Sequence, residues 1–208
     1  MNIPKLKEHE ERFFQSYPGG FQGEKMKEVA KKHKIEKMVK MVREGLTEEV
    51  FEDTEYALSM ILKVITASSL VSVFEKTAFR NHIKEITHDE KALLVLGFKE
   101  LLTGDQGAGF RLLTKHLEIY KLAKWPILTA PLYYSNPDVE VIIKPTTVKA
   151  VIEFFELKGI KYTTKPDYEF YKAYRACIKE LKENVRPELR VENGSFCGFL
   201  MFAVGLYD

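Results

Sequence analysis

The chain of 208 residues is long enough for one large domain or two small ones, and its 45% hydrophobic residues can build a proper core. Its 32 Lys and Arg residues nearly balance its 30 Asp and Glu residues, so the formal charge of +2 excludes a global attraction to nucleic acid or anionic membrane. Because it lacks a CxxC motif, a signal-peptide pattern and an apolar run of about 20 residues, it is predicted to be a soluble, cytoplasmic protein with buried thiols at Cys177 and Cys197.

Helices are predicted from the start of the chain. The sequence YPGG at residues 17–20 predicts a turn in which Gly19 takes the positive φ of a type II turn. Apolar residues at helical spacing predict a helix over residues 23–45, which Gly45 ends. Thr47 is predicted to cap the next helix.

Three more helices are predicted before the chain changes character. Thr87 and Glu90 have the spacing of a capping box, in which each side chain bonds the backbone amide of the other residue, so a helix is expected to begin there. The helices are predicted over residues 68–86, 90–104 and 109–125.

The pattern changes at residues 125–145. Four prolines in this stretch exclude one long helix. Within it, the sequence VEVII at residues 139–143 is rich in β-branched side chains and predicts a short β element.

The last part of the chain returns to helical patterns. Helices are predicted over residues 146–157 and 167–184, and the apolar residues 195–207 are predicted to form a buried helix or strand. The fold class is therefore mainly α, a multi-helix globular domain over residues 1–208 with the small β element, and a weak boundary near residue 125 is the alternative. The core stripe of the second of these helices is predicted to consist of Tyr171, Tyr174, Ile178 and Leu181.

A family resemblance rests on five segments that follow one another in the same order. They are YPGGF, SSLVSVFEKTAFR, WPILTAPLYYSNPDVEVIIKPTTVKAV, YTTKPDYEFYKAYRACIKEL and SFCGFLMFAVG. Together they cover most of the chain and resemble an uncharacterised family of bacterial proteins with no established activity. The resemblance implies a shared fold and a bacterial setting. Gly194 departs from the family pattern, which has a glutamine there, so no role is carried over for that amide.

Lys144 is placed for anion binding. It directly precedes Pro145, which suits the first position of a helix, and the free amides and positive dipole at a helix start favour an anion. Lys144, Thr146 and Thr147 are therefore predicted to form a phosphate or carboxylate site. In the alternative interpretation, Thr146 only caps the helix and Lys144 lies in water.

A second anion site is predicted on the helix of residues 68–86. Lys76 and Arg80 are four residues apart and share a helical face, where they could hold a phosphate. The alternative is a solvated edge or an ion pair with another helix.

A metal site is also considered and rejected. His82, Glu85 and Asp89 would line one face of a continuous helix, as a divalent metal requires. A cap at Thr87 would break that helix, however, so no metal site and no cofactor are predicted.

The strongest electrostatic feature lies between residues 24 and 43. This stretch holds eight Lys or Arg residues and three Glu residues, a surplus of five positive charges. With apolar residues on its other side, such a helix suits nucleic acid phosphate or an anionic membrane surface. Lys31, Lys34 and Lys37 are the predicted nucleic-acid-binding residues, and a solvated basic face is the alternative.

The preferred hypothesis is a non-enzymatic binding module that recognises an anionic partner, nucleic acid phosphate in the first place, through the basic helix and Lys144. Two alternatives stay open. A phosphate-ester-directed, nuclease-like enzyme would require Lys144, Arg80 and His82 to converge. A protein-interaction subunit would dock a partner through its apolar C-terminal segment.

Overall fold

The protein is described by a computed structural model, which covers residues 1–206 without the side chains of residues 29, 30 and 32. Across this part of the chain there are eleven α-helices, three short 3-10 helices and no strand. The predicted mainly α fold is therefore confirmed. Among the same residues, no helix combines the length and the apolar character that crossing a bilayer requires.

The N-terminal helices are more broken than predicted. The type II turn is confirmed, with Gly19 at φ 81° and ψ 2°, and the 3-10 helix η1 (Gly20–Gln22) follows it. The prediction of a single helix over residues 23–45 is wrong. Lys34 takes the left-handed conformation at φ 51° and divides this stretch into two helices. Hydrophobic spacing stays helical across this break, which is why the pattern indicated one helix. The three helices are α1 (Ile3–Ser16), α2 (Glu24–His33) and α3 (Ile35–Gly45).

The next helix begins later than predicted. The 3-10 helix η2 (Val50–Glu52) precedes α4 (Thr54–Ala67), and the carboxylate of Asp53 caps α4 by accepting an amide of its first turn at 3.0 Å. Thr47 is therefore not the cap of this helix. Since Asp and Thr are both good N-caps, residue preference alone could not choose between the two positions.

Capping boxes begin α5 (Val73–Glu85) and α6 (His88–Thr103). In the second of them, Thr87 and Glu90 bond each other's backbone amides, so this prediction is confirmed. α7 (Gln106–Ile119) then packs closely against α6.

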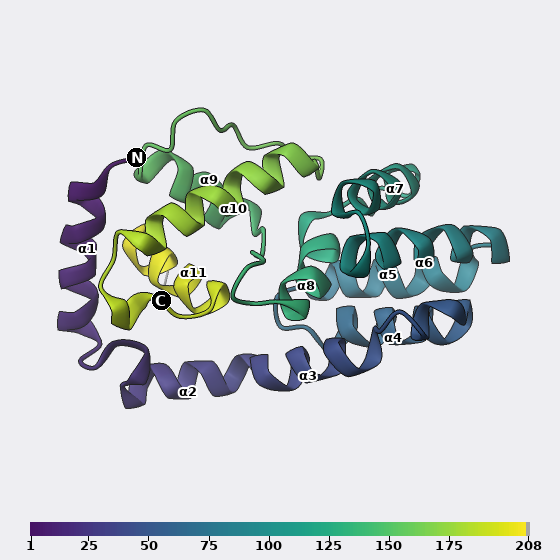
Figure 1. Cartoon of the computed structure of the whole chain (residues 1–208), viewed down its shortest axis with the longest axis horizontal. Helices are drawn as coiled ribbons and strands as arrows, with labels where there is room; N and C mark the ends of the chain where they lie inside the picture. Colours follow the sequence, from purple (N-terminus) through teal and green to yellow (C-terminus); the bar gives the residue numbers. More distant parts are fainter. Residues whose placement is uncertain (207–208) are drawn as a thin grey trace.

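The central helix is α8 (Trp125–Ser135), in which every residue from Trp125 to Tyr134 is buried. A helix that is apolar on every face is expected to lie inside the protein. Figure 1 shows α8 between a group formed by α4–α7 and a group formed by α1 and the last three helices. These three are α9 (Pro145–Phe154), α10 (Tyr168–Glu183) and α11 (Asn193–Ala203).

The C-terminal helices agree with the sequence patterns. α11 begins two residues before the predicted range of 195–207 and is the buried helix that was one of the two expectations there, although residue 207 lies outside the described part of the chain. The 3-10 helix η3 (Pro187–Leu189) leads into it. α10 buries the predicted core stripe, which is confirmed for Tyr171, Tyr174, Ile178 and Leu181.

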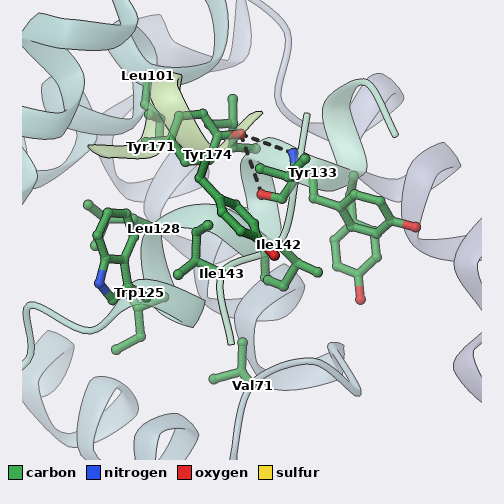
Figure 2. Close-up of a cluster of buried hydrophobic side chains, with 14 of the residues drawn as sticks. Val71, Leu101, Trp125, Leu128, Tyr133, Ile142, Ile143, Tyr171 and Tyr174 are labelled. Carbon is green, nitrogen blue, oxygen red and sulfur yellow. Dashed lines mark hydrogen bonds between the residues drawn. The ribbon is translucent and has the colours of Figure 1, made fainter. Parts of the chain in front are cut away.

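The prediction of a β element at residues 139–143 is wrong, because this segment forms no strand. Side chains, rather than a second strand, bond the backbone of this segment. The amide of Val141 donates to the hydroxyl of Tyr171 at 3.1 Å, and the amide of Ile143 donates to the hydroxyl of Thr129 at 3.1 Å. Figure 2 shows Ile143 and Tyr171 within the central core. The segment has the composition of a buried strand because it is buried, but its backbone needs no partner strand.

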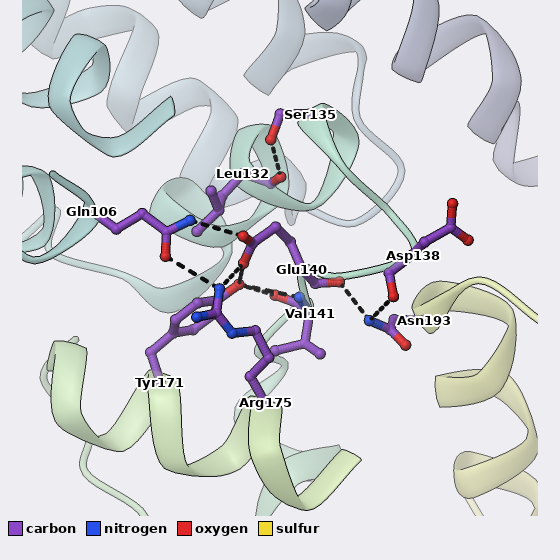
Figure 3. A network of polar contacts seen from close by, with 9 residues as sticks. All are labelled: Gln106, Leu132, Ser135, Asp138, Glu140, Val141, Tyr171, Arg175 and Asn193. Atoms are coloured by element: carbon purple, nitrogen blue, oxygen red, sulfur yellow. Dashed lines mark hydrogen bonds and ion pairs between the residues drawn. The ribbon is translucent and has the colours of Figure 1, made fainter. Parts of the chain in front are cut away.

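Glu140 lies at the centre of a buried polar network (Figure 3). The residue is 5% exposed, and its carboxylate accepts hydrogen bonds from Gln106 Nε2 at 2.8 Å, the Tyr171 hydroxyl at 2.7 Å and Arg175 Nη1 at 2.7 Å. Burial and the charge of Glu140 raise the pKa of Tyr171 well above its ordinary value, so its hydroxyl stays neutral. The network therefore fixes α7 and α10 to the segment before α9.

Candidate anion-binding cavity

A cavity of about 780 Å³ lies between α2, α3, α11 and the segment before α9. Its volume falls within the range of about 300–1,000 Å³ that is usual for small-molecule sites. We call it the lysine cavity, after the five lysines in its lining: Lys27, Lys31, Lys34, Lys37 and Lys144.

The lysine cavity contains residues of two sites that were predicted separately. Lys31 lies in the last turn of α2, Lys34 is the left-handed link, and Lys37 lies in the first turn of α3. These three side chains are exposed, whereas Lys144 is half-buried. Lys144 has φ −105° and ψ 113°, the extended backbone preferred before a proline such as Pro145. The cavity therefore has a basic rim and one deeper lysine.

Four of these lysines lack an acidic partner. Among the described residues, no carboxylate lies within 4.0 Å of the ammonium groups of Lys31, Lys34, Lys37 or Lys144. By contrast, Lys27 pairs with a glutamate one turn before it at 3.3 Å. The positive charge of the four lysines is thus available to an anion in the cavity.

Two acidic residues, Glu36 and Glu192, belong to the lining. Glu36 is exposed at the rim, whereas Glu192 is already bonded within the protein. Its carboxylate caps α11 by accepting the amides of Gly194 at 2.6 Å and Ser195 at 2.8 Å, and the hydroxyl of Tyr133 donates to it at 2.5 Å. Burial first, and then the charge of Glu192, raises the pKa of Tyr133 far above its ordinary value, so the phenol stays a neutral donor. Glu192 therefore supports the start of α11.

Gly194 is required by the close approach of Tyr133. A Cβ atom at position 194 would lie 2.2 Å from the Tyr133 hydroxyl oxygen, so any side chain there would displace the tyrosine from Glu192. This contact gives a physical reason for glycine at position 194.

Cys197 lines the cavity together with Lys144. Burial raises the pKa of the Cys197 thiol to about 11, although the positive charge of Lys144 acts in the opposite direction. The thiol therefore stays protonated at neutral pH and is a poor nucleophile. Cys197 and Cys177 are both free thiols, as predicted, although each is only half-buried.

The predicted partners of Lys144 do not join it in the cavity. Thr146 is exposed and Thr147 is 4% exposed, and neither residue is part of the cavity lining. Lys144 therefore faces the cavity without the hydroxyls that were expected to complete a pocket at the start of α9. A separate anion site at Thr146 and Thr147 stays a prediction.

The second predicted anion site lies elsewhere in the fold. Lys76 and Arg80 are on α5, in the group of α4–α7, and neither lines the lysine cavity. His82 is buried on the same helix and is also absent from the lining. The lysine cavity therefore does not bring Lys144, Arg80 and His82 together. Phosphate binding by Lys76 and Arg80 stays a prediction.

His82 pairs with a histidine that sequence reasoning did not connect to it. The Nε2 atoms of His82 and His116 are 3.2 Å apart, and both residues are buried. The ring of Tyr120 packs against His82 with centroids 4.2 Å apart. One imidazole must accept the hydrogen bond, so at least one ring is neutral. Nothing in their spacing of 34 residues could have indicated this contact.

The metal-binding face is interrupted, as the cap at Thr87 indicated. α5 ends at Glu85, and Asp89 belongs to α6. Both carboxylates are exposed, whereas His82 is buried. Within the described part of the chain, no three His, Cys, Asp or Glu side chains are grouped as a metal ion would need.

The histidine pair predicts a loss of stability in weak acid. Burial lowers the pKa of both His82 and His116, and the neighbouring carboxylates of Glu90 and Glu85 only partly oppose this at His82. As the pH falls past the ordinary value of 6.5, the unfolded chain takes up protons before the folded protein does. The stability that the neutral histidine pair contributes to the folded protein is therefore fully present above pH 6.5. It is lost as the pH falls towards the lowered pKa values of the two histidines in the folded state.

Urea unfolding between about pH 8 and about pH 5 would measure this loss. The double variant His82→Gln, His116→Gln removes both groups and is expected to show a flatter dependence on pH over this range. A dependence as steep as that of the wild-type protein would assign the acid sensitivity to other groups.

A second basic hollow, of about 580 Å³, was not predicted. Its cations are largely paired, Arg175 with Glu140 at 2.7 Å and Lys172 with Glu169 at 2.9 Å. It is therefore a weaker candidate for anion binding than the lysine cavity. The signal in the sequence was a helical spacing of basic residues on α10, namely Lys172, Arg175, Lys179 and Lys182.

The apolar C-terminal segment, which was considered as a docking surface, mainly serves the core. Phe196, Phe199 and Leu200 are buried in α11. The lysine cavity is thus the candidate site that combines a suitable volume with unpaired charge. The chain matches no family model, no curated protein and no solved structure.

Proposed function

We propose that this protein is a non-enzymatic binding module that holds an anionic partner in the lysine cavity. The observation that carries the proposal is the convergence of four lysines without acidic partners, from two distant parts of the chain, on one cavity. Ammonium groups around one partly enclosed space repel one another, so a bound anion would relieve that repulsion as well as gain hydrogen bonds.

Two cavity groups that could take part in catalysis, Cys197 and Glu192, are not prepared for it. A nucleophile or a general base needs a free, activated group within reach of a substrate. The Cys197 thiol is protonated because burial raises its pKa to about 11. Glu192 is engaged by Tyr133 and by the start of α11. Neither group is therefore prepared to attack a substrate or to remove a proton.

Nucleic acid phosphate is a second candidate partner, favoured by the exposure of Lys31, Lys34 and Lys37 at the rim. A polymer could reach these side chains without entering the cavity. Lys144 lies deeper, so its contribution separates the two candidates. The variant Lys144→Gln should weaken the binding of a small anion and leave the binding of an oligonucleotide nearly unchanged.

The proposal is tested with the triple variant Lys31→Gln, Lys37→Gln, Lys144→Gln. Labelled single-stranded DNA, duplex DNA and RNA would be measured by fluorescence anisotropy, and inorganic, pyro- and alkyl phosphates by calorimetry. We expect affinity for at least one of these anions to fall about tenfold or more, since a charge-assisted hydrogen bond contributes about 1.5–3 kcal/mol. Binding to the wild-type protein should weaken as salt is added.

The matched control is the triple variant Lys63→Gln, Lys115→Gln, Lys158→Gln, which removes the same charge from exposed positions outside the cavity. It is expected to bind like the wild-type protein apart from a small uniform loss. If no anionic probe distinguishes the two triple variants, the proposed function is wrong.

A further inference from the structure

We infer that the anion held in the lysine cavity is amphiphilic, with a phosphate-like or carboxylate head at the lysines and a single hydrocarbon chain inside. The inference rests on the proposed function and adds the class of ligand to it. It follows from the part of the lining that the lysines do not explain.

The inner wall of the cavity is apolar and comes from four separate parts of the chain. Met26 of α2 and Ile142 of the segment before α9 are each 4% exposed. Leu70, from the link between α4 and α5, and Met201 of α11 are half-buried. Flexible methionine side chains suit a wall that adapts to a hydrocarbon chain.

Most of the positive charge lies at the rim, and Lys144 and Glu192 are the half-buried charges beside the apolar wall. Lys31, Lys34 and Lys37 are exposed at the rim, whereas Met26 and Ile142 are among the least exposed residues of the lining. A fully hydrated anion would use the rim and leave the apolar wall in contact with water. A hydrocarbon chain would remove water from that wall, and a head group of negative charge would stay beside the lysines.

The other ligand classes fit only one part of this arrangement. A polyanion such as nucleic acid complements the rim but brings no apolar group to the wall. A neutral apolar molecule complements the wall but brings no counter-charge to a lining in which five lysines outnumber the two carboxylates of Glu36 and Glu192. The cavity volume of about 780 Å³ is in the range for a small ligand that is mostly enclosed.

A chain-length series provides the direct test. Butyl, hexyl, octyl and decyl phosphate would be titrated by calorimetry below their micelle concentrations, with decanol and decyltrimethylammonium as neutral and cationic controls. Each added methylene buried in the wall is expected to raise affinity by up to about fourfold. Affinity independent of chain length, or equal binding of the cationic amphiphile, would overturn the inference.

Two kinds of variant locate the head and the chain. Met201→Gln keeps the length of the side chain but adds a polar group to the wall, so it should weaken decyl phosphate severalfold and leave butyl phosphate unchanged. Lys144→Gln should weaken both. The control Leu93→Gln changes a residue that is 50% exposed on α6, outside the cavity, and should alter neither affinity. If the control also loses decyl phosphate binding, the assignment of the hydrocarbon chain to the apolar wall of the lysine cavity is wrong.

The source of the amphiphile is decided by comparing monomers with membranes. Co-sedimentation with anionic phospholipid vesicles would be measured beside the titration of monomeric decyl phosphate. Binding of the monomer, with or without vesicle binding, supports a ligand inside the cavity. Binding to vesicles alone would overturn it in favour of a surface contact.

The inference and the proposed function can fail separately. If inorganic phosphate or an oligonucleotide binds as tightly as decyl phosphate and loses affinity in the triple variant Lys31→Gln, Lys37→Gln, Lys144→Gln, the cavity lysines bind anions but the inference of an amphiphilic ligand is wrong. If no anion of any kind depends on the cavity lysines, both are wrong.

Discussion

Replacing Arg175 with methionine is expected to lower the free energy of unfolding by about 3–5 kcal/mol. The guanidinium donates to the buried carboxylate of Glu140 at 2.7 Å and also contacts the amide oxygen of Gln106 at 3.2 Å. Without the guanidinium, the carboxylate of Glu140, which is 5% exposed, keeps only the neutral donors of Gln106 and Tyr171. Urea unfolding at neutral pH, with circular dichroism as the signal, would measure the effect.

The control for this prediction lies on the same helix. Lys172→Met also removes a cation from α10, but Lys172 is exposed and its partner Glu169 lies in water, so stability should stay near that of the wild-type protein. The double variant Glu140→Gln, Arg175→Met removes both charges and should recover part of the loss. The single variant Glu140→Gln is measured beside them. If the double variant loses as much free energy of unfolding as Glu140→Gln and Arg175→Met lose in sum, the two charges do not interact and the assigned network is wrong.

Gly109→Ala is expected to cost about 1–3 kcal/mol, because it forces apart two helices whose backbones touch. A Cβ atom at this position would lie 2.4 Å from the backbone nitrogen of Leu101 and 2.6 Å from its Cα. A flexible side chain could move away from such a contact, but the backbone of α6 cannot. The same unfolding experiment measures the loss, which should appear as a lower midpoint with an unchanged slope.

Gly107→Ala is the matched substitution, two residues earlier in α7. Its Cβ would meet only side-chain atoms, at 3.0 Å from Tyr168 and at 3.2 Å from both Arg111 and the Asp105 carboxylate, and a shift of these side chains by a few tenths of an ångström, on the order of a normal packing adjustment, relieves the contacts. The gain in helix propensity offsets this small adjustment, so the variant should be close to the wild-type protein in stability. Equal losses at the two glycines would contradict this explanation, because the close approach to the α6 backbone occurs at Gly109 alone, and helix propensity and the unfolded state both favour alanine.

Features that depend on a few neighbouring residues were predictable. The capping box of Thr87 and Glu90 spans three residues, and the turn at Gly19 spans four, so each is determined by atoms close together in the sequence. The core stripe of α10 follows from the period of one helix. In such cases the chemistry that forms the element is present in the element itself.

The errors occur where a local preference has more than one tertiary solution. Residues 139–143 have the composition of a buried strand, but this composition predicts only that the segment is buried, and it does not predict that the segment is a strand. Whether a strand or the side chains of Tyr171 and Thr129 bond the backbone depends on packing with distant helices. Lys34 is a similar case, because a left-handed lysine is unfavourable locally and persists only when the surrounding fold holds it there.

The candidate site shows the same division. Local patterns were enough to predict the helical character of the chain, the position of Lys144 before α9 and the concentration of positive charge around Lys31, Lys34 and Lys37. The packing of distant helices brings these lysines to one cavity with an apolar wall and places Arg80 and His82 elsewhere. The reason is physical: caps, turns and helical periods are interactions between near neighbours, whereas a cavity is formed by the packing of helices that are far apart in the chain.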